Sequence, residues 1–291
     1  MDTAATQVED CLRGAVDRAH HDDCPPRFQE ALEYALFPGG ARIRPKLSLA
    51  VAQACATDRP AVSVAAAASV ELIHCASLVH DDLPCFDDAA TRRGKPALHV
   101  AFGQRLAVLV GDALIVMAFD TLARAARDCP SRLPTMLLAL SRGIGAPTGI
   151  AAGQAWECED SPTLDRYQRQ KTGALFVAAT EIGAASAGAA VDGWAPLGQG
   201  LGEAYQVVDD ILDVTADPEE IGKPVGQDSD LVRPNSVLQR GMRESEKYLE
   251  GLLENVASSI PACPGERELR QQIRHESDRF MDMALLRIAA A

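Results

Sequence analysis

Aromatic side chains are scarce in this chain of 291 residues: Phe, Trp and Tyr make up 4% of it, while apolar residues make up 47%. Runs in which Val, Ile, Thr and aromatic residues alternate with polar ones are also few, and such alternation is the usual signal of half-buried strands. Alanine-rich stretches such as 61–70 and 183–191 instead suit helices that pack closely together. The composition therefore predicts an all-α protein.

Positive charge is in deficit, because 28 Lys and Arg stand against 41 Asp and Glu and give a formal net charge of −13. A field of this sign repels phosphate, which argues against a nucleic-acid partner or an anionic membrane surface. It does not exclude a phosphorylated substrate, since local cations and metal ions can reverse the field inside a cleft.

The eight cysteines form no CxxC pair, so zinc-ligand spacing is lacking. The opening residues, Met1 to Thr6, have neither a basic region nor an apolar core, so we expect no secretion signal and a cytoplasmic protein with reduced thiols. Segment 173–191 has the length of a membrane span, but Glu181 near its centre would be costly in lipid. We therefore predict a buried helix there and no integral membrane segment.

Long linkers, low-complexity tracts and repeats at solenoid spacing are also lacking. Breaks rich in Pro and Gly, including the stretch 217–234, divide the chain into segments of about ten to thirty residues, which is long enough for helices. We therefore predict one continuous helical domain over residues 1–291.

Two clusters of aspartates stand beside apolar helical segments. Asp81–Asp88 follows segment 62–80, and Asp209–Asp213 lies in segment 197–214. Asp209 and Asp213 are four residues apart, a spacing that places both carboxylates on one face of a helix, and Asp210 is three residues from Asp213. Such like charges are unfavourable beside apolar residues unless a cation neutralises them, and oxygen ligands suit Mg²⁺. We therefore predict magnesium ions between the two clusters.

The metal ligands of the first cluster stay open at this point. Asp81 and Asp88 are seven residues apart and would share a helical face, whereas Asp87 would fall off that face on an ideal helix. Pro84 should distort the helix because it lacks an N–H and clashes with the preceding turn. Periodicity alone does not choose among these aspartates and Asp82.

Basic residues lie close to the aspartates in the sequence or recur further along it. They are Arg92, Arg93 and Lys95 after the first cluster, Arg42, Arg44 and Lys46 before it, and Lys171 and Lys223 beyond it. In so acidic a protein, cations beside paired carboxylates indicate a polyanion bridged by metal, and the arginine fork suits phosphate. The alternative, that Arg42, Lys46 and Arg92 only pair with surface carboxylates, also stays open.

Several short motifs, in order, resemble those of the trans-prenyltransferases, also called polyprenyl diphosphate synthases. They are PGGARIRP, ELIH, HDDLPCFDDAATRRGKP, KTG, QVVDDILD and GKPVGQD, between Pro38 and Asp228. The resemblance implies an isoprenoid synthase fold, a helical bundle around a central cavity, usually as a homodimer. It also implies condensation of isopentenyl diphosphate with an allylic prenyl diphosphate, using several Mg²⁺ ions, and the first motif is most like bacterial synthases of carotenoid pathways.

The resemblance also implies roles for individual residues. As metal ligands it points to Asp81, Asp87 and Asp209, supported by Asp82, Asp88, Asp210 and Asp213. For the allylic diphosphate it points to Arg92, Lys171, Thr172, Gln206 and Lys223. For isopentenyl diphosphate it points to Gly40, Arg44, His74 and Arg93. The chain departs from the family pattern at Ala41, where a lysine is usual, and at Arg233, which also replaces a lysine.

His74 has a plainer alternative, because a lone histidine on an apolar helix is more often a core residue. It precedes Asp81 by seven residues and so shares its helical stripe, which favours a phosphate contact. His20, His21 and His99 have no such support.

Small residues at the fifth and fourth positions before Asp81, Ala76 and Ser77, predict the product length. Family members that stop at fifteen carbons commonly carry a bulky aromatic there, so we expect geranylgeranyl diphosphate, with twenty carbons. Met117 and Phe119 are candidates for a deeper floor, and farnesyl diphosphate is the alternative if another bulky side chain closes the pocket early.

Three other classes share parts of this pattern. A terpene cyclase needs no isopentenyl site, a head-to-head synthase would be expected to show DxxxD motifs, and a regulatory subunit of a mixed dimer typically loses an aspartate motif. The sequence keeps both aspartate motifs and the isopentenyl set, which favours the chain-extending synthase.

Overall fold

The computed structural model describes residues 3–37, 40–160, 163–215, 237, 240 and 241–288, and the described chain is almost entirely helical. The helices are α1 (Thr3–Ala19), α2 (Pro26–Leu36), α3 (Ile43–Ala54), α4 (Pro60–Asp81), α5 (Leu98–Phe102), α6 (Gln104–Ala125), α7 (Leu133–Ile144), α8 (Ile150–Ala155), α9 (Leu164–Gln168), α10 (Ala174–Ser186), α11 (Ala195–Thr215), α15 (Met242–Val256) and α16 (Glu266–Ile288). The predicted all-α class is confirmed.

Shorter elements join these helices. They are the 3₁₀ turns η1 (Ala126–Asp128), η2 (Pro130–Arg132), η3 (Trp156–Cys158) and η5 (Ala257–Ser259), the π-helical turn η4 (Arg169–Gly173), and strands β1 (Thr91–Arg92) and β2 (Lys95–Pro96). The strands pair antiparallel, with Thr91 opposite Pro96 and Arg92 opposite Lys95. They form the one sheet found in the described residues.

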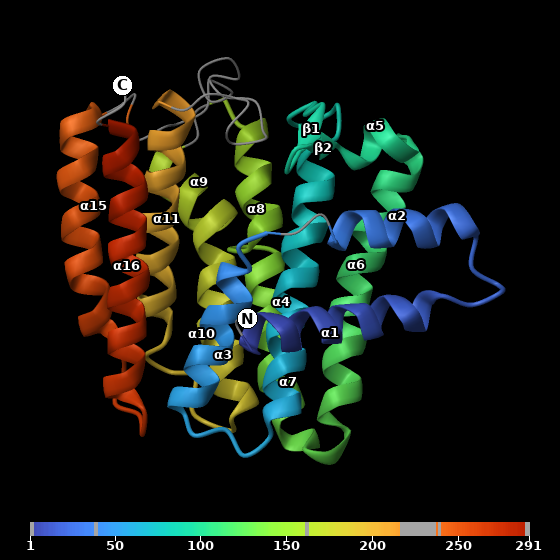
Figure 1. The fold of residues 1–291 in the computed structure, drawn as a ribbon, viewed down its shortest axis with the longest axis horizontal. Coiled ribbons are helices and arrows are strands. Elements are labelled where there is room, and N and C mark those ends of the chain that lie inside the picture. Colours follow the sequence, from blue (N-terminus) through green and yellow to red (C-terminus); the bar gives the residue numbers. More distant parts are fainter. Residues whose placement is uncertain (1–2, 38–39, 161–162, 216–236, 238–239, 289–291) are drawn as a thin grey trace.

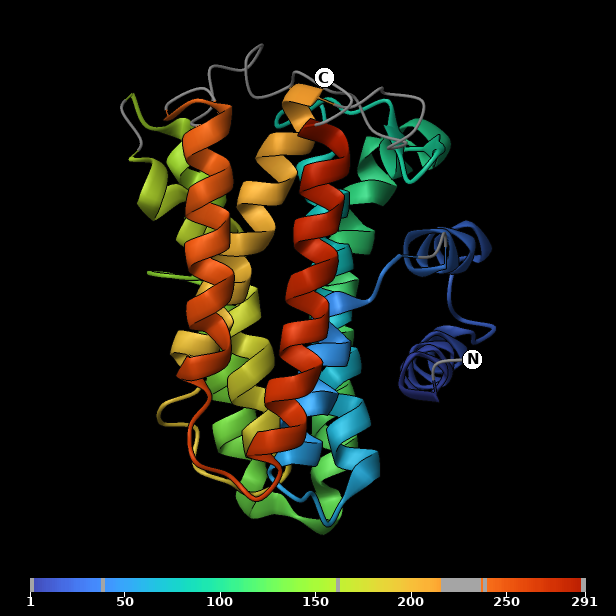
Figure 2. The ribbon, with the colours of Figure 1, turned by 60° about the vertical axis from the view of Figure 1, so that its left-hand side comes forward.

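The long helices run side by side as a bundle, whereas α1 and α2 lie across it on one side (Figures 1 and 2). Helix α4 packs along α6, and α10 packs between α3, α7 and α11. On the other side, α15 and α16 cover α11. Prolines at the first turns of α2 and α4 suit helix starts, because the missing N–H would have no partner there.

Small residues bring the central helices close together. A Cβ atom at Gly183 of α10 would lie 2.4 Å from the carbonyl oxygen of Ser48 in α3, so only glycine fits at this crossing. Helix α4 buries the alanine run 65–68 completely or nearly so, and its Ser69 hydroxyl donates to the carbonyl of Ala118 in α6 at 3.0 Å. This close packing replaces the aromatic core that the sequence lacks.

The segment 173–191 contains the buried helix α10, as predicted, and its Glu181 accepts a hydrogen bond from Arg142 at 2.8 Å. Two other helices are long and apolar enough to span a membrane by length and composition, Pro60–Asp81 and Gln104–Asp128. The apolar window of the first is 78% buried inside the bundle, which fits a core helix. The window of the second is 39% buried, and it leaves Val108, Leu109 and Val116 exposed.

Candidate active site

A cavity of about 220 Å³ opens where α4, α8, η4 and α11 converge. Its polar lining comprises Arg44, His74, Ser77, Asp81, Asp87, Arg92, Gln154, Tyr167, Lys171, Thr172, Tyr205, Gln206, Asp209 and Asp213. Leu78, Ala89, Ile150 and Leu175 supply the apolar part. The fold therefore gathers most of the residues that the motifs single out into one space.

The first aspartate cluster is a helix end followed by a loop that folds back. Helix α4 ends at Asp81, and the N–H of Asp87 donates to the carbonyl oxygen of Asp81 at 2.9 Å. This bond places Asp87 beside Asp81, although helical spacing would separate them. Asp82 is buried and is paired with Arg92, whose Nε donates to Asp82 Oδ1 at 2.9 Å. Asp88 is exposed in the left-handed region, with φ +47°.

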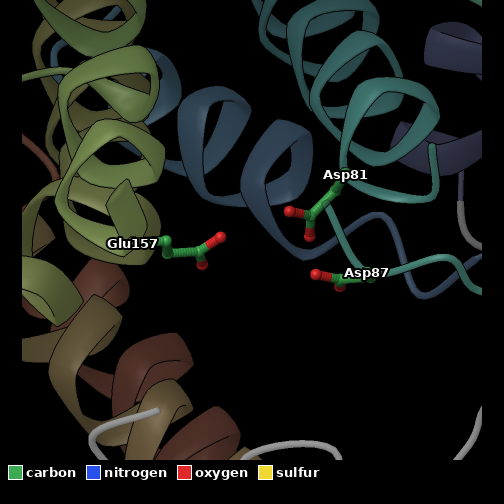
Figure 3. A group of neighbouring side chains, drawn as sticks. All are labelled: Asp81, Asp87 and Glu157. Atoms are coloured by element: carbon green, nitrogen blue, oxygen red, sulfur yellow. The ribbon is translucent and has the colours of Figure 1, made fainter. Parts of the chain in front are cut away.

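Glu157 approaches these aspartates from the opposite side, on a different part of the chain. Oxygens of Asp81, Asp87 and Glu157 all lie within 4.8 Å of one another, and Figure 3 shows the three carboxylates facing a common point. No motif points to Glu157, because it lies on the turn η3, more than sixty residues along the chain from Asp87. Gly153 of α8 lets η4 approach closely, because a Cβ atom there would lie 2.2 Å from the backbone nitrogen of Lys171.

Lys171 lies between the carboxylates of both walls. Its Nζ is 3.1 Å from Asp81 Oδ1 and 2.6 Å from Glu157 Oε1, and the Tyr167 hydroxyl donates to the same glutamate oxygen at 2.8 Å. Gln154 Nε2 donates to Asp81 Oδ1 at 3.2 Å. An ammonium group thus partly offsets the negative charge that a metal ion would neutralise.

Helix α11 carries the second cluster in the predicted arrangement. Asp209 and Asp213 both line the cavity, one helical turn apart. Asp210 is buried and accepts hydrogen bonds from Gln206 Nε2 at 2.8 Å and Gln168 Nε2 at 2.9 Å. The Thr172 hydroxyl donates to Gln206 Oε1 at 2.5 Å, so this partly buried network orients the side chains beside Asp209.

The carboxylates fit the predicted magnesium. Hard oxygen ligands are what Mg²⁺ prefers, and it commonly uses a few carboxylates together with substrate phosphates and water. Asp81, Asp87 and Glu157 offer such oxygens on two walls, and Asp209 offers another from α11.

A second part of the cavity concentrates positive charge. The guanidinium of Arg44 lies over Phe176, 4.5 Å from the ring centroid, and its Nε is buried without a hydrogen-bond partner among the described residues. Burial lowers the pKa of His74 well below its ordinary value, and the neighbouring Arg44 and Arg93 lower it further. A buried arginine with an unmet donor beside a neutral histidine suits an anionic ligand.

Gly40 and Arg93 meet at the edge of this basic region. Gly40 has φ +152°, and a Cβ atom there would lie 2.9 Å from the guanidinium carbon of Arg93. The glycine therefore leaves room for the arginine. Arg42, in contrast, is buried in the left-handed region and pairs with Glu71 and with Glu9, the latter at 2.7 Å. For Arg42, the alternative of a structural ion pair is the one that the structure supports.

The remaining predicted residues lie around the site or beyond the described chain. Ser77 lines the cavity, whereas Ala76 is buried in the hydrophobic core. Ala41 and Lys46 border a neighbouring cavity of about 400 Å³ that also reaches Asp209. Met117 and Phe119 are partly buried against the core. Lys223 and Arg233 lie outside the described residues.

Three comparisons with known proteins indicate the family of the chain. The family model described as Polyprenyl synthetase matches residues 25–268. The chain is 50% identical to a geranylgeranyl diphosphate synthase of Cereibacter sphaeroides over 94% of its own length and 96% of the relative's. It is 46% identical to the geranylgeranyl diphosphate synthase of Rhodobacter capsulatus, over 95% and 96% of the two chains.

A solved structure is similar over nearly the whole fold. A geranyltransferase from Helicobacter pylori, complexed with magnesium and isoprenyl diphosphate, has a TM-score of 0.80 and 28% identity. The match covers 96% of this chain and 98% of that one.

Proposed function

The chain belongs to the polyprenyl synthetase family, and on this premise we propose that it condenses isopentenyl diphosphate head to tail with allylic diphosphates, with geranylgeranyl diphosphate as the main product. The observation that carries the proposal is one cavity lined by Asp81, Asp87, Asp209 and Asp213 together with Arg44, Arg92 and Lys171, with Glu157 close to the first two aspartates. A regulatory subunit would not need this convergence. The chain is accordingly a trans-prenyltransferase in its own right.

Breaking the allylic carbon–oxygen bond is the first physical problem. Magnesium, when bound, neutralises the charge that develops on the departing diphosphate. Asp81, Asp87, Glu157 and Asp209 would hold the ions. Arg92 and Lys171 line the same space and can contact the allylic diphosphate directly, and Thr172 and Gln206 offer hydrogen bonds from the adjoining wall.

The allylic carbocation must then react with isopentenyl diphosphate before it reacts with water. Arg44, His74 and Arg93, with Gly40, would hold isopentenyl diphosphate, so that its double bond lies near the allylic carbon. Leu78, Ile150 and Leu175 line the cavity and exclude water from the carbocation. The proton lost from the condensed product would pass to the released diphosphate.

Small side chains below the diphosphate site favour the twenty-carbon product. Ser77 lines the cavity on α4, and Ala76 next to it is small and buried in the core behind that lining. The two bacterial relatives that are 50% and 46% identical are geranylgeranyl diphosphate synthases, which supports the same length. Farnesyl diphosphate remains the alternative product.

An exposed apolar face on α6 supports a homodimer. Val108, Leu109 and Val116 are 42%, 54% and 66% exposed, and Leu138 of α7 is 60% exposed. A second copy of the chain would cover the exposed side chains of α6 through a two-fold interface, and exposed apolar surface commonly marks such interfaces. Light scattering should then give twice the chain mass of 30.9 kDa.

We further propose that the enzyme is cytoplasmic. We also propose that its product feeds carotenoid synthesis, because the sequence of the first aspartate motif resembles that of synthases in such pathways.

The direct test is condensation of labelled isopentenyl diphosphate with dimethylallyl, geranyl and farnesyl diphosphates by the purified protein. We expect magnesium-dependent formation of a twenty-carbon product. Asp81→Ala and Asp209→Ala should each lower turnover by orders of magnitude, while circular dichroism shows an intact helical fold. Near-normal turnover in both variants would refute the assignment of the metal site.

A further inference from the structure

His80 directly precedes Asp81, yet its side chain lies against α6 and is not part of the cavity lining. We propose that His80 is a positioning residue, which fixes the last turn of α4 to α6 and thereby sets the place of Asp81 and the loop after it. The inference rests on the proposed function, because it assumes that Asp81 serves a metal site.

The last turn of α4 needs an external anchor for electrostatic reasons. The final carbonyl groups of a helix lack intrahelical partners and form the negative end of the helix dipole. Asp81 and Asp82 add two carboxylates at this end, where negative charge is unfavourable. Arg92 pairs with Asp82 and Lys171 with Asp81 on the side of the cavity, and His80 holds the turn on the side of α6.

The aspartate loop depends on this same turn. The N–H of Leu83 donates to the carbonyl of His80 at 3.1 Å, and the N–H of Asp87 donates to the carbonyl of Asp81 at 2.9 Å. A shift of the last turn would therefore carry Asp81 and Asp87 together. Their distance to Glu157, which comes from the opposite wall, would change with it.

The imidazole of His80 makes a defined set of contacts with α6. Its Nε2 lies 3.3 Å from the carbonyl oxygen of Val108 and 3.7 Å from Asp112 Oδ1. With the proton on Nε2, the ring donates to that carbonyl beside the carboxylate. A Cβ atom at Gly111 would lie 2.0 Å from the same nitrogen, so the ring rests directly on the glycine backbone. This contact of His80 with α6 requires both a donor at the Nε2 position and a glycine at position 111.

This geometry gives a graded set of variants. The amide nitrogen of glutamine reaches about as far as Nε2 and keeps the donor, whereas the shorter asparagine reaches only the Nδ1 position. His80→Gln should therefore resemble the unaltered protein, and His80→Asn should resemble His80→Ala. A role in packing alone would not favour glutamine over asparagine.

The first measurement is hydrogen exchange followed by mass spectrometry on the full chain without metal. In His80→Ala, amides of the segment 81–88 should exchange about fivefold faster, a ratio that corresponds to one net hydrogen bond. Peptides from α10 should be unchanged. The second measurement is calorimetric titration with magnesium chloride and inorganic diphosphate, in which the affinity of His80→Ala should fall by about fivefold.

Gly111→Ala tests this contact from the other side. Alanine has the higher helix propensity, so any loss cannot come from propensity. On its own, Gly111→Ala should have the same effects as His80→Ala. In a chain that already carries His80→Ala it should have no further effect, because both substitutions remove the same contact.

Several results would overturn the proposal. They are additive effects of the two substitutions, a rise in exchange spread evenly over all helices, unchanged affinity for magnesium diphosphate in His80→Ala, or no advantage of glutamine over asparagine. If the unaltered protein itself neither bound magnesium diphosphate nor made a prenyl product, the proposed function would fail instead. The two failures are therefore distinguishable.

Discussion

Replacing Glu157 with glutamine tests the residue that the motifs did not reveal. The substitution keeps the size of the side chain and removes one charge from a group of three carboxylates whose oxygens lie within 4.8 Å of one another. At an effective dielectric constant of about 20, two unit charges at that distance repel by roughly 3 kcal/mol. A cation between them therefore gains much of its binding energy from the presence of all three.

The magnitude follows from how metal sites respond to the loss of one supporting group. Loss of an outer-shell partner of a metal ligand typically weakens metal binding by about 10- to 100-fold, or about 1.4–2.7 kcal/mol, and loss of a ligand itself should cost no less. We expect Glu157→Gln to raise the magnesium concentration for half-maximal turnover by that factor. Lys171 keeps its contact with Asp81 at 3.1 Å, so the fold of the site should survive.

The assay is the rate of isopentenyl diphosphate incorporation over a magnesium titration, with circular dichroism as a check of folding. Glu159→Gln is the matched control, because it removes the same charge from an exposed position two residues away. The control should behave like the unaltered protein. An unchanged magnesium dependence in Glu157→Gln would refute the view that this carboxylate belongs to the metal site.

Three further predictions concern the isopentenyl site, the product and the core. Ala41→Lys should lower the Michaelis constant for isopentenyl diphosphate, since one charged contact is worth about 1.5–3 kcal/mol at most; an unchanged constant would mean that another cation, such as Lys46, already serves there. Ser77→Phe or Ala76→Phe should shift the chromatographed product from twenty carbons to fifteen, and a persistent twenty-carbon product in both would refute the chain path along α4. Glu71→Ala should lower the free energy of unfolding by about 3–5 kcal/mol in thermal melts, because it strips a buried partner from Arg42; a loss below about 1 kcal/mol would show that Glu9 alone suffices.

Regular helices are where the sequence was most informative. Asp209 and Asp213 line the cavity together because α11 is unbroken there, so a spacing of four residues translates directly into one face. The scarcity of aromatics and of strand-like runs likewise indicated an all-helical chain.

The sequence was least informative where the chain leaves the helix. Asp87 reaches Asp81 through a loop that folds back on a backbone hydrogen bond, which no periodicity describes. Glu157 arrives from a distant 3₁₀ turn, so its place depends on tertiary packing alone. Arg42 resembled a phosphate-binding cation in the sequence, yet the left-handed backbone turns it into the interior towards Glu71. A local sequence pattern does not predict partners that only the tertiary fold brings close.

The π-helical turn η4 has a consequence for how this region can change over evolution. A regular helix advances 100° per residue, and a π turn accommodates one additional residue without unwinding its neighbours. Deleting a single residue from Arg169–Gly173 could thus restore an α-helix and leave α10 seated in the core. It would also rotate everything before the deletion, including Tyr167 and Gln168, away from Glu157 and Asp210. The length of this turn therefore keeps Tyr167 and Gln168 aligned with Glu157 and Asp210, in addition to the contacts that Lys171 and Thr172 make through their own side chains.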